Sequence, residues 1–183
     1  MPELLAACVV RELRPDRGNG VTAIDKVALR SRAKIGPYGL RSDVQVDRKH
    51  HGGFDKAVYA YAQEDAEYWE NELGRELPAG WFGENLRVSG IDVNAARIGE
   101  QWRIGTDEAS VVLEVTMPRT PCGTFARWVG GEHERGWVKR FGAAGRLGAY
   151  LRVVKRGSVA AGDPIEVVHS PDTELTVLGM FRA

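Results

Sequence analysis

The chain has 183 residues, of which 43% are hydrophobic and 27% are charged, and its formal net charge is zero. This composition is typical of a folded globular protein, and no apolar run approaches the ~20 residues that a membrane span requires. The two cysteines, Cys8 and Cys122, are too few for a disulfide scaffold or a four-cysteine metal site. Because the start also lacks a secretory signal, we expect a cytoplasmic protein whose residues 1–183 form one domain.

The zero net charge conceals a segregation of charge along the chain. Residues 1–60 carry 11 basic and 7 acidic side chains, residues 61–118 carry 4 and 12, and residues 119–156 carry 9 and 2. If the two basic segments converge in space, they form a cleft that attracts a small anion; the alternative is that both are solvated surfaces. The chain lacks the overall excess of Lys and Arg that nucleic-acid-binding proteins carry, so we expect no nucleic-acid partner.

Short strand-like segments separated by glycine dominate the chain. In chain order, we expect strands at residues 4–13, 24–29, 43–47, 57–61, 84–88, 101–104, 110–116, 149–154 and 164–168. Residues 63–73 carry apolar side chains at helical spacing and precede Gly74, which predicts a helix that ends there. One or two further helices are expected between Cys122 and Phe141. With 22 glycines, the pattern predicts a mainly β fold with a few helices and a curled or closed sheet.

Cys122 is the candidate reactive residue. It directly follows a predicted strand, in a segment where Pro118 and Pro121 restrict the backbone and leave the thiol in a loop. Arg119 and a helix beginning after Cys122 would both lower the pKa of the thiol. A thiolate is a nucleophile and a ligand for soft metals. The alternative is a small buried hydrophobe, which is what we expect of Cys8 within its apolar strand.

Two other segments combine glycine with polar side chains. Residues 49–56 read Lys-His-His-Gly-Gly-Phe-Asp-Lys, in which the glycines let backbone amides approach a ligand, although a hairpin turn would use them equally well. Glu84 and Asn85 stand beside aromatic residues, where they orient a bound group or serve a turn. The adjacent His50 and His51 would face opposite ways in a strand, which is a poor arrangement for gripping one metal ion.

Taken in order, these segments resemble the MOSC family, named for the C-terminal domain of molybdenum cofactor sulfurases. The matching segments are residues 34–40 with 43–45, 51–61, 82–86, 98–105, 118–122, and 145–146 with 162–163. The resemblance covers roughly residues 25–168. Ser42 departs from the family, which usually has Gly before the Asp of the opening loop. Only residues 170–183 follow the last predicted strand, so no helical C-terminal extension is expected.

The resemblance implies a β-barrel-like fold and a pterin-based molybdenum cofactor, that is, molybdopterin with bound molybdenum. It implies Cys122 as the catalytic residue, which binds the metal or carries sulfur. The residues implied to hold the pterin and its phosphate, or to line the substrate face, are Lys34, His51, Lys56, Asn85 and Arg119. Standalone bacterial members reduce N-hydroxylated compounds, so the implied partners are a small N-hydroxylated substrate and a separate electron-donor reductase. A homodimer is compatible with the sequence.

Three functions remain open on the sequence. The first is a molybdenum-dependent reductase of N-hydroxylated compounds. The second is a binding module that holds the cofactor, or a persulfide on Cys122, for delivery to another protein. The third is a domain that binds neither. Turnover with a chemical reductant separates the first function from the other two.

Overall fold

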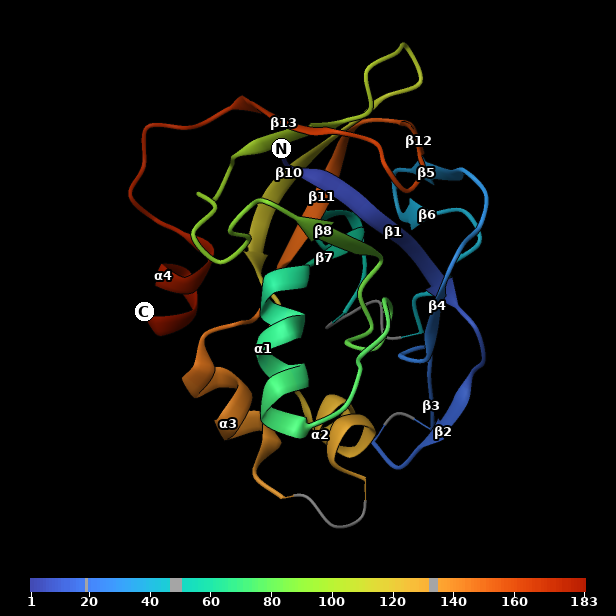
Figure 1. Ribbon diagram of the computed structural model, residues 1–183, viewed down its shortest axis with the longest axis vertical. Coiled ribbons are helices and arrows are strands. Elements are labelled where there is room, and N and C mark those ends of the chain that lie inside the picture. The colour runs from blue at the N-terminus through green and yellow to red at the C-terminus, as the bar shows by residue number, and fades with distance from the viewer. Residues whose placement is uncertain (19, 47–50, 132–134) are drawn as a thin grey trace.

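The computed structural model describes residues 1–18, 20–46, 51–131 and 135–183. The strands of the largest sheet are β1 (Glu3–Val10), β4 (Lys26–Ala28), β7 (Val58–Ala62), β8 (Leu86–Ser89), β9 (Gln101–Ile104), β10 (Val111–Pro118), β11 (Ala149–Lys155) and β13 (Ile165–His169). They follow the order β13-β9-β10-β11-β7-β8-β1-β4 (Figure 1). Neighbours are antiparallel, apart from the parallel pair β7 and β8.

Two smaller sheets and several helices complete the described part of the chain. A three-stranded sheet has the order β12-β5-β6, and a two-stranded sheet pairs β2 with β3; these strands are β12 (Gly157–Val159), β5 (Ala33–Gly36), β6 (Gly39–Leu40), β2 (Arg14–Asp16) and β3 (Gly20–Thr22). The helices are the 3₁₀ turn η1 (Phe54–Lys56), α1 (Gln63–Leu73), α2 (Gly123–Gly130), α3 (Trp137–Ala144) and α4 (Val177–Arg182). Among the described residues, no helix is long and apolar enough to cross a bilayer.

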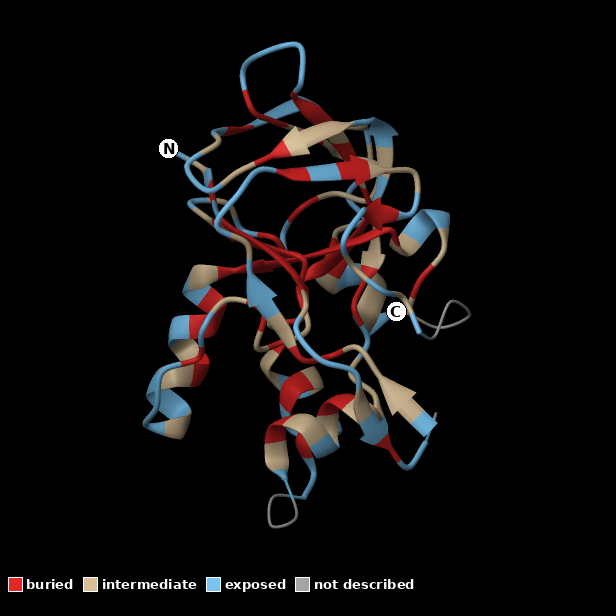
Figure 2. Ribbon diagram, turned by 90° about the vertical axis from the view of Figure 1, so that its right-hand side faces the viewer, coloured by how far each residue is buried: buried red, intermediate tan, exposed pale blue. Residues whose placement is uncertain are grey.

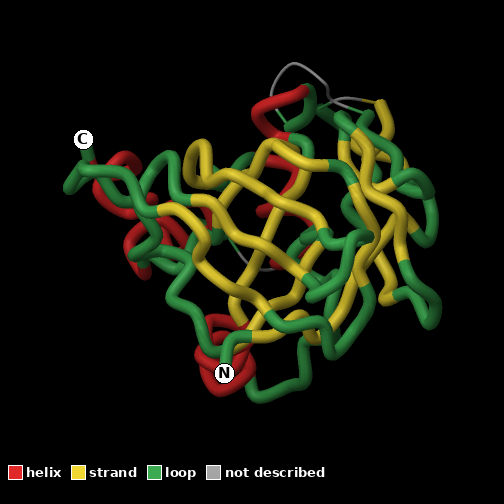
Figure 3. The backbone as a smooth tube through the Cα atoms, turned by 90° about the horizontal axis from the view of Figure 1, so that it is seen from above, coloured by secondary structure: helices red, strands yellow, loops and turns green. Residues whose placement is uncertain are grey.

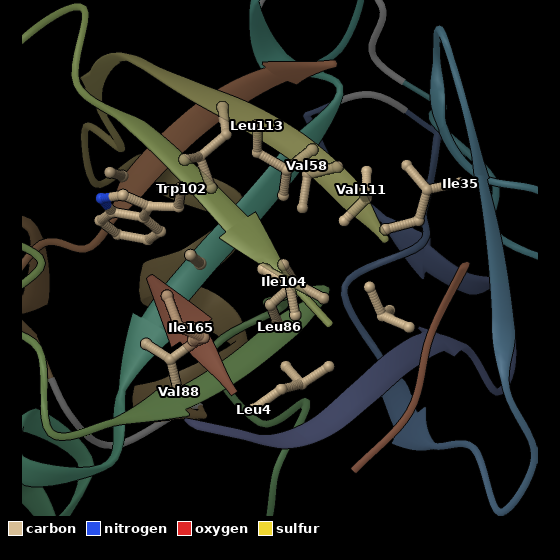
Figure 4. Packing of buried hydrophobic residues seen from close by; sticks show 14 of the residues in the cluster. Leu4, Ile35, Val58, Leu86, Val88, Trp102, Ile104, Val111, Leu113 and Ile165 are labelled. Atoms are coloured by element: carbon tan, nitrogen blue, oxygen red, sulfur yellow. The ribbon is translucent and has the colours of Figure 1, made fainter. Parts of the chain in front are cut away.

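The interior of the curled sheet contains a hydrophobic cluster. Because successive strand residues point to opposite faces, alternate residues of each strand enter this cluster. Figure 4 shows Leu4, Leu86, Trp102, Ile104 and Leu113 meeting there from four strands, and each is fully buried. Burying one such side chain contributes about 1.5–3 kcal/mol, so this interior is a major source of stability.

A second, aromatic cluster lies between the sheet and helices α1, α2 and α3. Strand β7 contributes to both clusters, since Val58 and Ala60 enter the first and Tyr59 and Tyr61 enter the second. Both faces of this strand are therefore covered, and all five of its residues are buried. In Figure 2, the buried residues lie in the central strands, and the exposed residues lie on the loops and on the outer faces of the helices. The helices thus pack against one side of the sheet through aromatic side chains.

The large sheet curls without closing into a barrel (Figure 3). At one end, the backbone N–H of Leu4 donates to the carbonyl of Asp163, and that of Ile165 donates to the carbonyl of Pro2, both at 2.9 Å. The start of β1 therefore meets the chain that leads into β13. The strands at the two ends of the sheet order, β13 and β4, do not pair with each other. The mainly β prediction is confirmed, but the sheet is open.

Most predicted elements are confirmed, and the exceptions have local causes. The helix over residues 63–73 ends at Gly74, which adopts the left-handed conformation (φ 62°). The predicted strand at residues 43–47 is wrong over its described part, residues 43–46. The Asp43 carboxylate accepts hydrogen bonds from three other segments, and this holds the chain out of a sheet. One helix was not predicted: α4 forms within the last residues of the chain.

We predict that Cys8→Ser lowers the free energy of unfolding. Cys8 lies on β1 with no exposed surface, and burial raises the pKa of its thiol well above the usual range. A hydroxyl group is more costly than a thiol to remove from water at this fully buried position, so the loss should be about 1–3 kcal/mol by chemical denaturation. Cys122→Ser is the matched control, because Cys122 is only partly buried and lies outside the strands. A larger loss in Cys122→Ser than in Cys8→Ser would contradict the prediction.

Candidate functional site

Cys122 lies at the junction between strand β10 and helix α2. The strand ends at Pro118 and the helix begins at Gly123, so Cys122 is the N-cap residue, with an extended backbone (φ −131°, ψ 172°). Its carbonyl accepts the hydrogen bond of the Ala126 N–H at 2.9 Å, which starts the helix. The thiol therefore lies beside the positive end of the helix dipole, which favours a thiolate.

Cys122 lines a pocket of about 100 Å³ that is built from segments far apart in the sequence. Of the six predicted site residues, the pocket brings together Cys122, His51, Lys56, Asn85 and Arg119. Lys34 is the exception: it lies on β5 and lines a second pocket instead. The walls of the two pockets share Asp43 and Gln45, so they are neighbours.

The pKa of the Cys122 thiol is lowered to about 6 by its surroundings. Partial burial acts in the opposite direction and raises the pKa. This effect is outweighed by hydrogen bonding from His51, by the positive charge of Arg119 and by the backbone N–H of Phe125 in the first turn of α2. At neutral pH Cys122 is therefore mainly a thiolate, and it has the chemistry of a nucleophile and of a soft-metal ligand.

His51 is oriented by a residue that the sequence analysis did not identify. Its Nδ1 atom lies 2.8 Å from the hydroxyl oxygen of Tyr150, which is on strand β11. Tyr150 in turn packs against Tyr59 of β7, with ring centroids 5.6 Å apart. The imidazole is thus held by a side chain of the central sheet, and it hydrogen-bonds to the Cys122 thiol.

Arg119 places a buried positive charge in the pocket wall. Its side chain packs over the rings of Phe125 at 4.6 Å and Tyr59 at 5.8 Å, and the residue is only 5% exposed. Its Nη1 atom donates to the carbonyl of Thr120 at 3.2 Å, and no described carboxylate forms an ion pair with it. A buried guanidinium without a carboxylate is costly, so this site favours an anion such as the Cys122 thiolate or an anionic ligand.

Asn85 supports the pocket wall by joining separate strands. Its Oδ1 atom accepts from the backbone N–H of Tyr59, and its Nδ2 atom donates to the carbonyl of Cys8 and to Oδ2 of Asp43. Asp43 also receives the ammonium group of Lys26 at 2.5 Å. Both amide hydrogens of Asn85 are therefore used within the protein. Asn85 therefore organises the pocket wall, and the role implied by the resemblance, holding the cofactor or lining the substrate face, stays a prediction.

Of the pocket residues that the sequence analysis did not assign to the site, Tyr150 and Lys26 carry no local signal, whereas Asp43 lies in the matched segment 43–45. Tyr150 is part of an ordinary strand pattern, and Lys26 and Asp43 reach the pocket only because β4 pairs with β1 and Asn85 binds Asp43. His51 lies in a bend and not in a strand, while His50 lies outside the described residues. Across the described ranges, no group of three or more His, Cys, Asp or Glu side chains is placed to hold a metal ion.

Comparison with known proteins identifies the family. A model of the MOSC domain matches residues 47–166. The chain is 34% identical over 156 residues to YflK of Bacillus subtilis, covering 85% of this chain and 67% of YflK. It is 28% identical over 150 residues to YiiM of Escherichia coli, covering 80% and 64%. A Gibberella moniliformis protein named "Reductase" is 31% identical over 138 residues, which are 72% of this chain and 23% of that protein. The chain belongs to the MOSC domain family.

Solved structures agree with this assignment at the level of the fold. The crystal structure of YiiM from Geobacillus stearothermophilus has a TM-score of 0.79 at 24% identity, covering 100% of this chain and 83% of that chain. YiiM from Escherichia coli has a TM-score of 0.71 at 20% identity, covering 98% and 75%. The family predicted from the ordered motifs is therefore confirmed, as is the mainly β class.

We predict that Cys122 reacts with a thiol-alkylating reagent in proportion to its thiolate fraction, with a midpoint near pH 6. Reactivity should rise as pH increases through this value, which is well below the ordinary pKa of 9.0 for a cysteine thiol. His51→Ala removes a group that stabilises the thiolate, so its midpoint should move upward. Iodoacetamide labelling followed by mass spectrometry measures both profiles, and Cys122→Ser reports any labelling of Cys8. A His51→Ala midpoint at or below that of the wild type would contradict the prediction.

Proposed function

We propose that this MOSC domain binds the molybdenum cofactor and reduces small N-hydroxylated compounds with electrons from a separate donor protein. The observation that supports this proposal is the Cys122 thiolate next to the buried, carboxylate-free Arg119. The relative named "Reductase" fits a redox role. The proposal also assigns the protein to the cytoplasm, where reducing conditions keep such a thiol free.

The donor chemistry of the pocket fits the cofactor. Molybdenum bound to a dithiolene is a soft centre that prefers sulfur, and Cys122 supplies one thiolate. The cofactor is also anionic, and the cations Arg119 and Lys56 line the same pocket. A pocket of about 100 Å³ is smaller than the ~300–1,000 Å³ of typical ligand pockets. It would therefore take the metal and the reacting end of the substrate, with the pterin extending beyond its enclosed part.

The residues of this chain would perform binding and proton transfer. The bound cofactor supplies the two-electron chemistry by which R–NH–OH, two electrons and two protons become R–NH₂ and water. Cys122 would hold the metal, and Arg119 would balance negative charge beside it. His51, oriented through Nδ1 by Tyr150, holds a proton at Nε2 that can pass to the departing oxygen. The partial burial of this site limits the access of bulk water.

A second candidate function is supported by the small volume of the pocket. A persulfide on Cys122 needs far less space than a pterin, and a thiol with a lowered pKa accepts and releases sulfur readily. Such a protein would carry sulfur or cofactor to another protein and would not reduce a substrate. Anaerobic assays with the cofactor and a chemical reductant distinguish the two functions, because only the reductase converts a hydroxylamine to an amine.

We predict that Cys122→Ser abolishes molybdenum retention while the fold stays intact. A hydroxyl group is a harder, weaker ligand than a thiolate for this metal. Elemental analysis after co-expression with cofactor synthesis measures the metal, and circular dichroism monitors folding. Cys8→Ser is the control and should keep its molybdenum, since Cys8 lines neither of the two pockets described here. Equal metal content in wild type and Cys122→Ser would refute the assignment of the ligand.

We also predict that NADH alone gives no turnover, whereas NADH with a separate reductase does. The two cysteines cannot ligate an iron–sulfur cluster, which takes four ligands. The glycines at 142, 145 and 148 precede strand β11, whereas a dinucleotide fingerprint requires a helix at that place. Absorbance at 340 nm measures NADH oxidation by the loaded protein. Direct oxidation of NADH by the purified chain would overturn this prediction.

A further inference from the structure

The second pocket is larger than the Cys122 pocket and has a different chemical character. It has a volume of about 640 Å³, and strands β5, β6 and β12 form its wall. Three basic side chains line it: Lys34, Arg41 and Arg156. Among the described residues that line it, Asp43 is the only acidic one, and its carboxylate already binds Lys26 and Asn85.

Strand register explains why the basic residues gather on one side. Ile35 pairs with Leu40, and both are buried against the core, so their neighbours Lys34 and Arg41 point to the other face. The backbone N–H of Arg41 donates to the carbonyl of Lys34 at 2.9 Å, which makes these residues direct cross-strand neighbours. Ser158 is paired with Lys34 from the other side, so its hydroxyl group joins the same face.

These cations lack protein partners within the part of the chain that the structure describes. Lys34, Arg41 and Arg156 are exposed, and none of them has a side-chain hydrogen bond or ion pair there. Like charges directly opposite each other on neighbouring strands are destabilising. A bound anion relieves this repulsion. The space for it is present, because a Cβ atom added to Gly36 on the same strand would meet no atom within 4 Å.

An exposed aromatic pair lies beside the basic residues. Tyr38 lines the pocket from the turn between β5 and β6, and its ring centroid is 4.4 Å from that of Phe54. Both side chains are unusually exposed for aromatic residues, at 61% and 58%. A flat π surface in water stacks favourably with a planar heterocycle. The pocket therefore combines a surface for an aromatic ring with donors for an anion.

We propose that this pocket binds a mononucleotide, with its phosphate on Lys34, Arg41 and Arg156 and its base on Tyr38. Phosphate geometry matches a guanidinium fork and an ammonium group, and Ser158 adds a neutral donor. The inference goes beyond the proposed reductase function and does not rest on it, because the basic side chains and the aromatic ring that would bind the nucleotide line only the second pocket. The bound nucleotide is either a substrate that reaches Cys122 across the shared wall or a separate ligand that does not react.

Isothermal titration calorimetry of the full chain with AMP and with inorganic phosphate tests this inference. AMP should bind at least about tenfold more tightly than phosphate. Arg41→Ala and Lys34→Ala should each lower the affinity for AMP about tenfold, which is the loss expected for one charge-assisted hydrogen bond. Tyr38→Ala should weaken AMP and leave phosphate binding unchanged. Arg30→Ala is the matched control, because Arg30 is equally exposed and lines neither pocket.

Equal affinity for AMP in Arg30→Ala, Lys34→Ala and Arg41→Ala would overturn the proposal. It would also be overturned if the wild-type protein bound an acidic protein or RNA more tightly than AMP and Arg41→Ala abolished that tighter binding. Cys122 alkylation identifies the source of the ligand. Protection of Cys122 by AMP supports a nucleotide substrate that spans both pockets, and unchanged labelling supports a separate nucleotide ligand. These measurements need no molybdenum, so failure of the proposed reductase function leaves their outcome intact.

Discussion

The site depends on a buried hydrogen-bonded junction centred on Asn85 and Asp43. Asn85 binds β7 at Tyr59 and β1 at Cys8, and it delivers its remaining amide hydrogen to Asp43. Asp43 binds Lys26 of β4, and both side chains of this ion pair are only 8% exposed. Removing one member of such a pair leaves an unpaired buried charge, which is strongly destabilising. The junction therefore holds Asp43 in place, and Asp43 forms part of the wall of both pockets.

The aromatic cluster provides rigidity on the other side of the Cys122 pocket. Tyr59 donates its hydroxyl hydrogen to the carbonyl of Leu147 at 2.8 Å, so its ring is fixed at both ends. Arg119 rests on this ring, and Tyr150 packs against it while holding His51. The groups that tune Cys122 are thus attached to central strands, where packing restricts their rotamers. A preorganised arrangement of this kind stabilises a thiolate without further rearrangement.

The two pockets differ in how their charges are balanced. In the Cys122 pocket, Arg119 lies next to a thiolate, and Lys26 is neutralised by Asp43. In the second pocket, the lysine and arginines described above have no carboxylate partner in the described chain. The basic segments at 1–60 and 119–156 do meet in space, but they meet at two places. The cations therefore gather in two pockets and not in one cleft, and Asp43 and Gln45 belong to the walls of both pockets.

The sequence by itself determined the class of fold and the family, and it indicated Cys122 as the candidate reactive residue. Strand alternation, the helix that ends at Gly74 and the segment around Cys122 are local patterns, and local patterns survive in the folded protein. The tertiary structure alone decided which residues surround Cys122. Tyr150, Lys26 and Asp43 reach the pocket through strand pairing and long-range hydrogen bonds, which leave no trace in a single sequence. Lys34 is the converse case: its motif indicated the Cys122 site, but the register of β5 with β6 and β12 turns its side chain into the neighbouring pocket.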